Sequence, residues 1–172
     1  MFYFAVMTRI GLLSDTHGFL DAAVFNHFEK CDEVWHAGDF GTVAIAEQLQ
    51  AFKPLRGVWG NIDGYDVRSA YPQHLHWLCE DVPVFMTHIG GYPGRYAPGI
   101  RQEISNSNAA LFICGHSHIL KVMYDDKLQC LHMNPGAAGH HGWHTVRTLL
   151  RFSIDGKQIK DCEVVEIGKR GR

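Results

Sequence analysis

The chain has 172 residues, of which 46% are hydrophobic and 20% are charged, and its formal net charge is -2. This length fits one domain with a substantial buried core, so we expect a single domain over residues 1–172. The balanced charge excludes a general attraction to nucleic acid or to an anionic membrane. Any binding of phosphate must therefore come from a local site.

The cysteines and the N-terminal segment bear on the compartment. Five cysteines are scattered along the chain without a Cys-x-x-Cys pair, at Cys31, Cys79, Cys114, Cys130 and Cys162. They predict reduced, mostly buried thiols of a cytoplasmic protein. The apolar stretch from Met1 to Met7 carries no basic residue and is too short for a bilayer, so we expect no signal peptide. Met7 resembles a natural first residue more than Met1 does.

The first third of the chain alternates strand and helix patterns. Buried-strand patterns cover residues 10–13, 33–37 and 55–59, and a helical spacing covers 20–28. A second helix is expected from Thr42, as its N-cap, to Phe52. Helices between successive strands predict right-handed βαβ units and a parallel sheet.

The rest of the chain is richer in strands. The expected elements are strands at 75–78, 82–87 and 111–114, a loop at 90–99, a short helix at 100–107, and strands at 119–124 and 128–133. A last hairpin, 145–154 and 158–166, turns at Asp155-Gly156, which is a strong hairpin signal. A parallel half followed by an antiparallel half predicts an α/β fold with two packed sheets and helices outside.

Polar clusters follow five of the predicted strands. They are Asp15-Thr16-His17-Gly18, Gly38-Asp39, Gly60-Asn61-Ile62-Asp63, Thr87-His88 and Gly115-His116-Ser117-His118-Ile119. In an open α/β sheet, the loops after the carboxyl ends of the strands gather in one crevice. We therefore expect seven ligands to meet there: Asp15, His17, Asp39, Asn61, His88, His116 and His118.

The chemistry of these seven side chains favours two transition-metal ions. Asp15 and His17 are two residues apart, as are His116 and His118, so the side chains of each pair point the same way. Asp39 follows a glycine and can bridge two ions. Two divalent ions carry +4 and two carboxylates return -2, which leaves an excess for an anionic substrate. Imidazole suits manganese, iron, nickel or zinc, of which we favour manganese.

Each cluster alone is weak evidence. A single Asp-x-His or His-x-His pair is more often a surface pair than a site, and a lone Gly-Asn is more often a turn. Five clusters in order, each at the end of a strand, predict a metal site together.

The ordered motifs also carry a resemblance. They are Ser14-Asp15-Thr16-His17-Gly18, His36-Ala37-Gly38-Asp39, Gly60-Asn61, Thr87-His88, Gly115-His116-Ser117-His118 and Asn134-Pro135-Gly136. From Met7 to about Glu166 the chain resembles the calcineurin-like metallophosphoesterases, in particular the small single-domain phosphodiesterases related to the retromer subunit Vps29. The domain core is therefore expected over residues 7–166.

The resemblance implies both a fold and a ligand set. The fold is a four-layer α/β/β/α sandwich with two mixed β-sheets. One ion is held by Asp15, His17, Asp39 and His118, and the other by Asp39, Asn61, His88 and His116.

The chain departs from the larger relatives at two places. Where those phosphatases have a histidine that protonates the leaving group, this chain has Ile62, as is common in the small branch. This favours diesters with good leaving groups. Where relatives commonly read His-Gly-His, this chain reads Thr87-His88-Ile89-Gly90-Gly91, so a donor is missing and the loop up to Pro93 is expected to shape a different pocket.

The other histidines are interpreted separately. We expect His36 to support the site and His27, His74, His76 and His132 to be surface or half-buried residues. The run from Gly139 to His144 is more simply a solvated, histidine-rich loop. A weaker hypothesis is that His140 or His141 contacts bound phosphate.

Together these features predict a dinuclear metal-dependent phosphodiesterase. Hydroxide held between the ions attacks phosphorus, and Asp39, Asn61 and His88 are the catalytic candidates. The substrate is a small phosphodiester or phosphoester, without a membrane or a nucleic-acid polymer as partner, since no basic stripe is present. A homo-oligomer is left open. The alternative is a non-catalytic scaffold or interaction protein of the Vps29 type.

Overall fold

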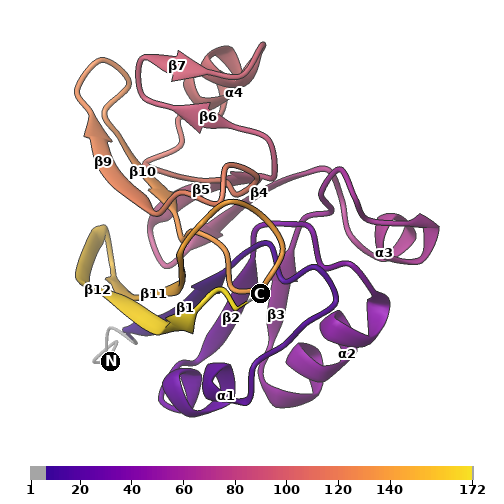
Figure 1. The fold of residues 1–172 in the computed structure, drawn as a ribbon. Coiled ribbons are helices and arrows are strands. Elements are labelled where there is room, and N and C mark those ends of the chain that lie inside the picture. The colour runs from indigo at the N-terminus through magenta and orange to yellow at the C-terminus, as the bar shows by residue number, and fades with distance from the viewer. Residues whose placement is uncertain (1–6, 172) are drawn as a thin grey trace.

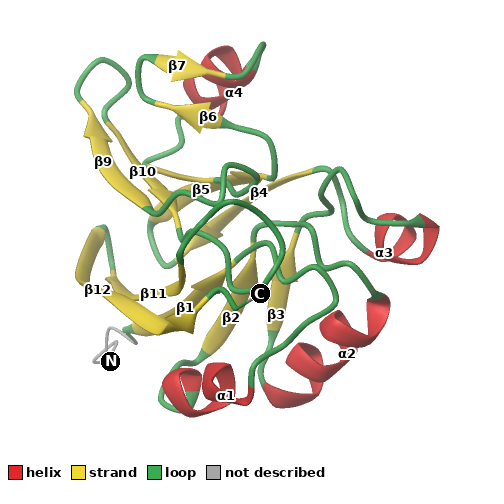
Figure 2. Ribbon diagram, in the orientation of Figure 1, coloured by secondary structure: helices red, strands yellow, loops and turns green. Residues whose placement is uncertain are grey.

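Two five-stranded sheets form the centre of the molecule (Figures 1 and 2). The computed structural model describes residues 7–171. The prediction about Met1 and the stretch that precedes Met7 therefore lies outside the described residues. The two sheets and the helices that cover them form the mixed α/β sandwich expected from the sequence.

The first sheet contains the three predicted parallel strands. Its order is β12-β11-β1-β2-β3, with β1, β2 and β3 parallel and β11 and β12 added antiparallel. The bounds are β1 Thr8–Leu13, β2 Glu33–His36, β3 Leu55–Gly57, β11 Val146–Asp155 and β12 Gln158–Lys169. The helices that link the parallel strands are α1 Ala22–Phe28 and α2 Val43–Phe52.

The second sheet corrects the prediction of an antiparallel second half. Its order is β4-β5-β8-β10-β9, and the three central strands β5, β8 and β10 are parallel. Only the edge strands β4 and β9 pair antiparallel. The bounds are β4 His74–Cys79, β5 Val82–Thr87, β8 Leu111–Ile113, β9 Lys121–Asp125 and β10 Cys130–Asn134. The helix α4, Ile100–Ser107, makes the crossover that parallel pairing of β5 and β8 requires.

Three short elements lie in segments that the sequence pattern left as loop. They are the helix α3 Tyr65–Ala70 and the two-residue strands β6 Gly91–Tyr92 and β7 Arg95–Tyr96, which pair antiparallel. The last hairpin, β11–β12, returns to the first sheet instead of extending the second (Figure 1).

Three hydrophobic clusters follow from this layering. Ile10, Leu12 and Trp35 of the first sheet pack with Met86 and Ile113 of the second, which fills the space between the sheets. The outer face of the first sheet packs on α1 and α2, and the outer face of the second packs on α4. Four of the five cysteines are buried and Cys162 is exposed, as expected. Among the described residues, no helix has both the length and the apolar character needed to cross a bilayer.

Candidate metal centre

The polar loops that follow the strands of the two sheets meet at the carboxyl ends of these strands. Two groups of side chains there have ligand atoms that all lie within 4.8 Å of one another. The first group is Asp15, His17 and His118, and the second is Asp39, His88 and His116. The seventh predicted ligand, Asn61, joins the second group, because its Oδ1 lies 2.9 Å from His116 Nδ1. All seven predicted positions are thus brought to one place.

The first group is arranged around a fully buried carboxylate. Asp15 Oδ1 lies 3.1 Å from His118 Nε2 and 3.8 Å from His17 Nε2. The two imidazoles face each other, with 3.3 Å between their Nε2 atoms. The other oxygen of Asp15 accepts the backbone N–H of His116 at 3.2 Å, which fixes the carboxylate.

Asp39 lies between the two groups. Its Oδ2 is 3.2 Å from His88 Nε2 in the second group and 3.6 Å from His17 Nε2 in the first. Its Oδ1 accepts the backbone N–H of Ile62 at 3.0 Å, so the carboxylate is held from one side only. One oxygen of Asp39 is therefore placed to serve both groups.

The donor set fits a pair of divalent ions, because it leaves buried polar atoms without partners. Asp15 Oδ1 and His88 Nε2 are both buried and make no hydrogen bond among the described residues, and the polar atoms 3.1 and 3.2 Å from them belong to other predicted ligands, His118 and Asp39. His88 Nδ1 lies 2.8 Å from the carbonyl of Ala37, which orients Nε2 toward the centre. An unpartnered buried polar atom is costly, and a bound cation removes that cost for an oxygen and a nitrogen at once.

The charges of the centre are strongly coupled. Burial disfavours the ionised form of Asp15, yet the imidazoles of His118 and His17 outweigh it and lower the pKa of that carboxyl. Burial acts in the same way on Asp39, where His88 lowers the pKa. For His88 burial is outweighed by Asp39, so its pKa is raised. The carboxylates are therefore ionised, as metal ligands must be.

The backbone is strained where it presents the ligands. Five of the predicted ligand residues have φ in the left-handed region: 54° at Asp15, 47° at His17, 57° at Asp39, 66° at His116 and 58° at His118. Such conformations cost free energy and cluster at functional sites. Gly60 permits a close approach, since a Cβ there would lie 2.0 Å from Asp39 Oδ1.

Several supporting residues lie outside both groups. His36 is fully buried, with Nε2 3.0 Å from Thr16 Oγ1, and burial lowers its pKa to about 3. Asp63 accepts the backbone N–H groups of Gly41 and Gly60, each at 2.8 Å. Sequence analysis gave no role to Arg68, which donates to the carbonyls of Asp63 and Asn61 at 2.7 and 3.0 Å. No motif marked Arg68, because it lies on the unpredicted helix α3.

The histidine-rich loop between β10 and β11 lies next to the first group. The His141 ring centroid is 4.9 Å from that of His17. His140 packs on Phe19, with 4.1 Å between ring centroids, and its Nδ1 contacts the carbonyl of Arg170.

His132 corrects a sequence-based expectation. It was expected to be surface-exposed or half-buried, but it is only 1% exposed and neither ring nitrogen has a partner among the described residues. Its strand, β10, lies inside the second sheet and is covered on both faces, which the pattern of one strand does not reveal.

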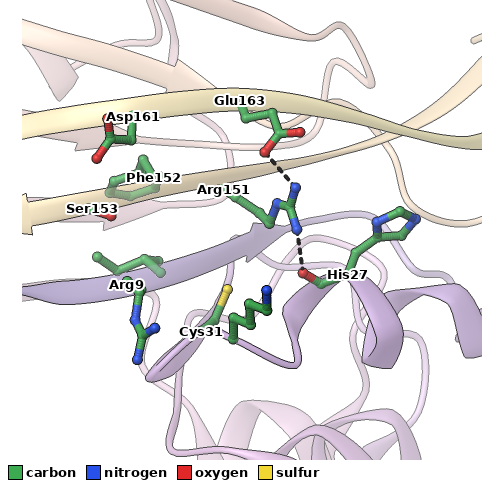
Figure 3. Close-up of a pocket in the computed structure, with 10 residues that line it drawn as sticks. Arg9, His27, Cys31, Arg151, Phe152, Ser153, Asp161 and Glu163 are labelled. Carbon is green, nitrogen blue, oxygen red and sulfur yellow. Dashed lines mark hydrogen bonds and ion pairs between the residues drawn. The ribbon is translucent and has the colours of Figure 1, made fainter.

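A hollow of about 170 Å³ lies away from the metal centre, between α1 and the β11–β12 hairpin (Figure 3). Arg151 donates there to the carbonyl of His27 at 2.9 Å and to Glu163 at 2.5 Å, and Arg9 pairs with Asp32 at 3.0 Å. Both guanidinium groups therefore already have partners in this hollow.

Comparison with known proteins agrees with this geometry. Residues 8–157 match the calcineurin-like phosphoesterase superfamily domain. Over 167 residues, 92% of each chain, the sequence is 28% identical to the "Probable metallophosphoesterase" of Methanothermobacter thermautotrophicus. The fold is similar to that of an archaeal phosphodiesterase, with TM-score 0.71, 22% identity and coverage of 92% of this chain and 100% of the other. It is also similar to that of Vps29 complexed with Zn²⁺ from Entamoeba histolytica, with TM-score 0.73, 14% identity and coverage of 92% and 99%.

Proposed function

We propose a function from the premise that this chain belongs to the calcineurin-like phosphoesterase superfamily. The protein is a phosphodiesterase in which the seven predicted ligands of the candidate metal centre hold two divalent ions. The observation that carries this proposal is the pair of His/Asp groups with Asp39 between them. Manganese is the favoured ion, with iron, nickel and zinc as alternatives.

The ions would supply the positive charge that stabilises a phosphoryl transition state and lowers the pKa of water. The residues of the chain hold and orient the reacting groups. Asp39 ties the two halves of the centre together, His88 is fixed by the Ala37 carbonyl, and Asn61 adds a neutral oxygen. The neutral ligand keeps net positive charge at the site for an anionic substrate.

The preference for diesters rests on Ile62. This side chain is 46% exposed beside the centre, and its backbone N–H is bonded to Asp39. A hydrocarbon side chain cannot protonate a poor leaving group, a step that contributes about 10²–10⁴-fold where an acid is present. Diesters with acidic leaving groups, such as aryl esters, are therefore the substrates that this site serves best.

Phosphate contact by the histidine-rich loop is part of the proposal. His141 is the stronger candidate, because its ring lies beside His17. His140 already uses Nδ1 on the Arg170 carbonyl and has only Nε2 for a ligand. The His141→Ala variant is expected to raise the KM for a diester a few-fold more than His140→Ala does. Equal, unchanged kinetics in both variants and in the double variant would remove the loop from the site.

A single assay tests the function. Purified protein is supplied with Mn²⁺, and hydrolysis of bis-(p-nitrophenyl) phosphate is compared with that of p-nitrophenyl phosphate, with and without chelator. We expect the diester to be hydrolysed faster and the chelator to abolish both reactions. Protein that binds no metal after soaking in Mn²⁺, by elemental analysis, would overturn the proposal.

The alternative, an interaction protein of the Vps29 type, is favoured by one observation. Apolar side chains are exposed on and just before the edge strand β9, at Ile119, Val122 and Tyr124. Metal binding without any hydrolysis in the same assay would support that alternative. The complete ligand set makes the enzyme the better-supported function.

A further inference from the structure

A pocket of about 260 Å³ opens directly beside the second group of ligands. Asn61 and His88, which belong to that group, also line the pocket. The first group contributes no residue to its wall. A substrate whose phosphorus is held at the metal centre would therefore extend one substituent into this space.

The wall of the pocket is aromatic and aliphatic. Trp59 comes from the loop after β3, Ile89 from the loop after β5, and Ala97 and Pro98 from the segment before α4. Gln73 and His74, at the start of β4, add polar groups at its exposed rim. Ligand pockets combine mostly apolar walls with a few polar groups in this way.

The indole of Trp59 is held in place. The guanidinium carbon of Arg68 lies 4.3 Å from the Trp59 ring centroid, and the same guanidinium donates to the Asn61 carbonyl at 3.0 Å. The backbone N–H of Trp59 donates to the Pro72 carbonyl at 3.0 Å, which fixes the main chain at this position. A fixed aromatic wall next to a metal ligand provides a surface for a planar ring, since aromatic pairs gain beyond their buried area.

The lining of this pocket disfavours a second phosphate group. Among the described residues that line it, none is Lys, Arg, Asp or Glu. A phosphate or carboxylate moved into it would lose water without gaining a charged partner, which is costly. The occupant is therefore neutral, and the flat face of Trp59 favours a planar one.

We propose that this pocket, which we call the Trp59 pocket, binds an aromatic or heteroaromatic ester group of the phosphodiester substrate, with Trp59 and Ala97 as specificity-determining residues. The inference rests on the proposed function, because that function places phosphorus beside Asn61 and His88. It adds a substrate class, namely diesters with at least one ring substituent.

The test measures binding and does not require turnover. Phenylphosphonate and methylphosphonate share the phosphonate group and differ only in the ring, and each is titrated calorimetrically into Mn²⁺-loaded protein. We expect phenylphosphonate to bind at least about tenfold more tightly, which corresponds to about 1.4 kcal/mol. The Trp59→Leu variant should reduce this ratio to about one, with the methylphosphonate affinity unchanged.

Two further variants make the result decisive. Trp59 also packs against the core beneath α2, whereas Ala97 packs at the edge of the α4 core, so Ala97→Phe, which fills the pocket, tests the same point without changing the core that Trp59 contacts. Trp143→Leu is the matched substitution for the ring preference, because Trp143 is 100% exposed and does not line the Trp59 pocket. Trp143 belongs to the histidine-rich loop, so only the ratio of the two phosphonate affinities is compared. We expect Ala97→Phe to abolish the preference and Trp143→Leu to keep it.

The outcomes separate this inference from the function on which it rests. Equal binding of both phosphonates by a protein that hydrolyses bis-(p-nitrophenyl) phosphate overturns the pocket and leaves the function standing. A ring preference lost in Trp143→Leu but kept in Ala97→Phe also overturns it. A protein that binds neither phosphonate and also hydrolyses no diester in Mn²⁺ overturns both. A ring preference in a protein without hydrolysis supports the pocket and overturns catalysis.

Discussion

Among the described residues, buried polar atoms without partners include two at the candidate metal centre and two in the second sheet, and these two regions differ in what surrounds them. At the candidate metal centre, which we call the loop edge, Asp15 Oδ1 and His88 Nε2 lie among further carboxylates and imidazoles. Inside the second sheet, both ring nitrogens of His132 lack partners among the described residues, and the ring lies beside Phe112, with 5.4 Å between ring centroids. Burial alone therefore does not distinguish a site from an isolated polar residue.

The difference lies in convergence. At the loop edge each of the two groups offers three ligand atoms, from one carboxylate and two imidazoles, that lie within 4.8 Å of one another, so one cation can satisfy several of them together. His132 belongs to neither group of ligands, and its burial only lowers its pKa, to about 4. A metal ion should thus act on the first region and leave the second unchanged.

Replacing Asp39 should have the largest effect on metal binding and activity at the loop edge. Because its Oδ2 lies between His88 and His17, Asp39→Asn removes a charge from both groups. We expect bound metal to fall from two ions per chain and diesterase activity to drop at least about a hundredfold, as when one charge-stabilising group is lost. Elemental analysis and the diester assay measure the two effects.

The matched control for this variant is Asp63→Asn. Asp63 is also buried and bonded to glycine N–H groups of the same loops, but it belongs to neither group of ligands. We expect this variant, and likewise His36→Gln, to keep both ions and to lose much less activity. Losses equal to that of Asp39→Asn would show that the ligands have been assigned to the wrong residues.

The loop edge could be anticipated from sequence because its signals are local. Asp15, His17, Asp39, His116 and His118 each follow a hydrophobic run, and the rule that loops gather at the carboxyl ends of strands brings them together. The burial of His132 could not be anticipated, because it depends on the pairing of β10 with both β8 and β9. The parallel pairing of β5, β8 and β10 was missed for the same reason.

Metal binding should stabilise the fold through the loop edge alone. At a free Mn²⁺ concentration of 100 times its dissociation constant, the free energy of unfolding should rise by about 2.7 kcal/mol. Chemical denaturation in Mn²⁺ and in chelator measures this increment. It should disappear in Asp15→Asn and persist in His132→Leu. An increment lost in both variants would contradict the distinction between the two regions.

Adding a proton donor at position 62 should show whether the loop edge lacks a general acid. We expect Ile62→His to raise the ratio of monoesterase to diesterase activity by about tenfold, the lower part of what positioned proton transfer contributes. Ile62→Gln is the matched control, since it is polar but supplies no acid near neutral pH. An unchanged ratio in Ile62→His, with both ions bound, would place residue 62 away from the leaving group.

The smallest effect concerns His132 and its pH dependence. Burial and, to a smaller extent, Lys121 together lower the pKa of His132 to about 4, whereas an unfolded chain titrates near 6.5. Between these values the unfolded chain binds a proton that the folded chain does not. The free energy of unfolding therefore falls as the pH drops below about 6.5, by at most about 1.4 kcal/mol per pH unit, and this loss is complete near the folded pKa.

Leucine at position 132 should remove that dependence. From pH 8 to pH 5 in chelator, His132→Leu should lose about 1–2 kcal/mol less unfolding free energy than the parent chain. His27→Leu, at a half-buried position on α1, is the control and should follow the parent. If His132→Leu followed the parent too, the ring nitrogens of His132 would have partners in the folded protein. His132 would then no longer be an example of a buried histidine without partners. The contrast with the candidate metal centre would fail, because the buried polar atoms of both regions would have partners.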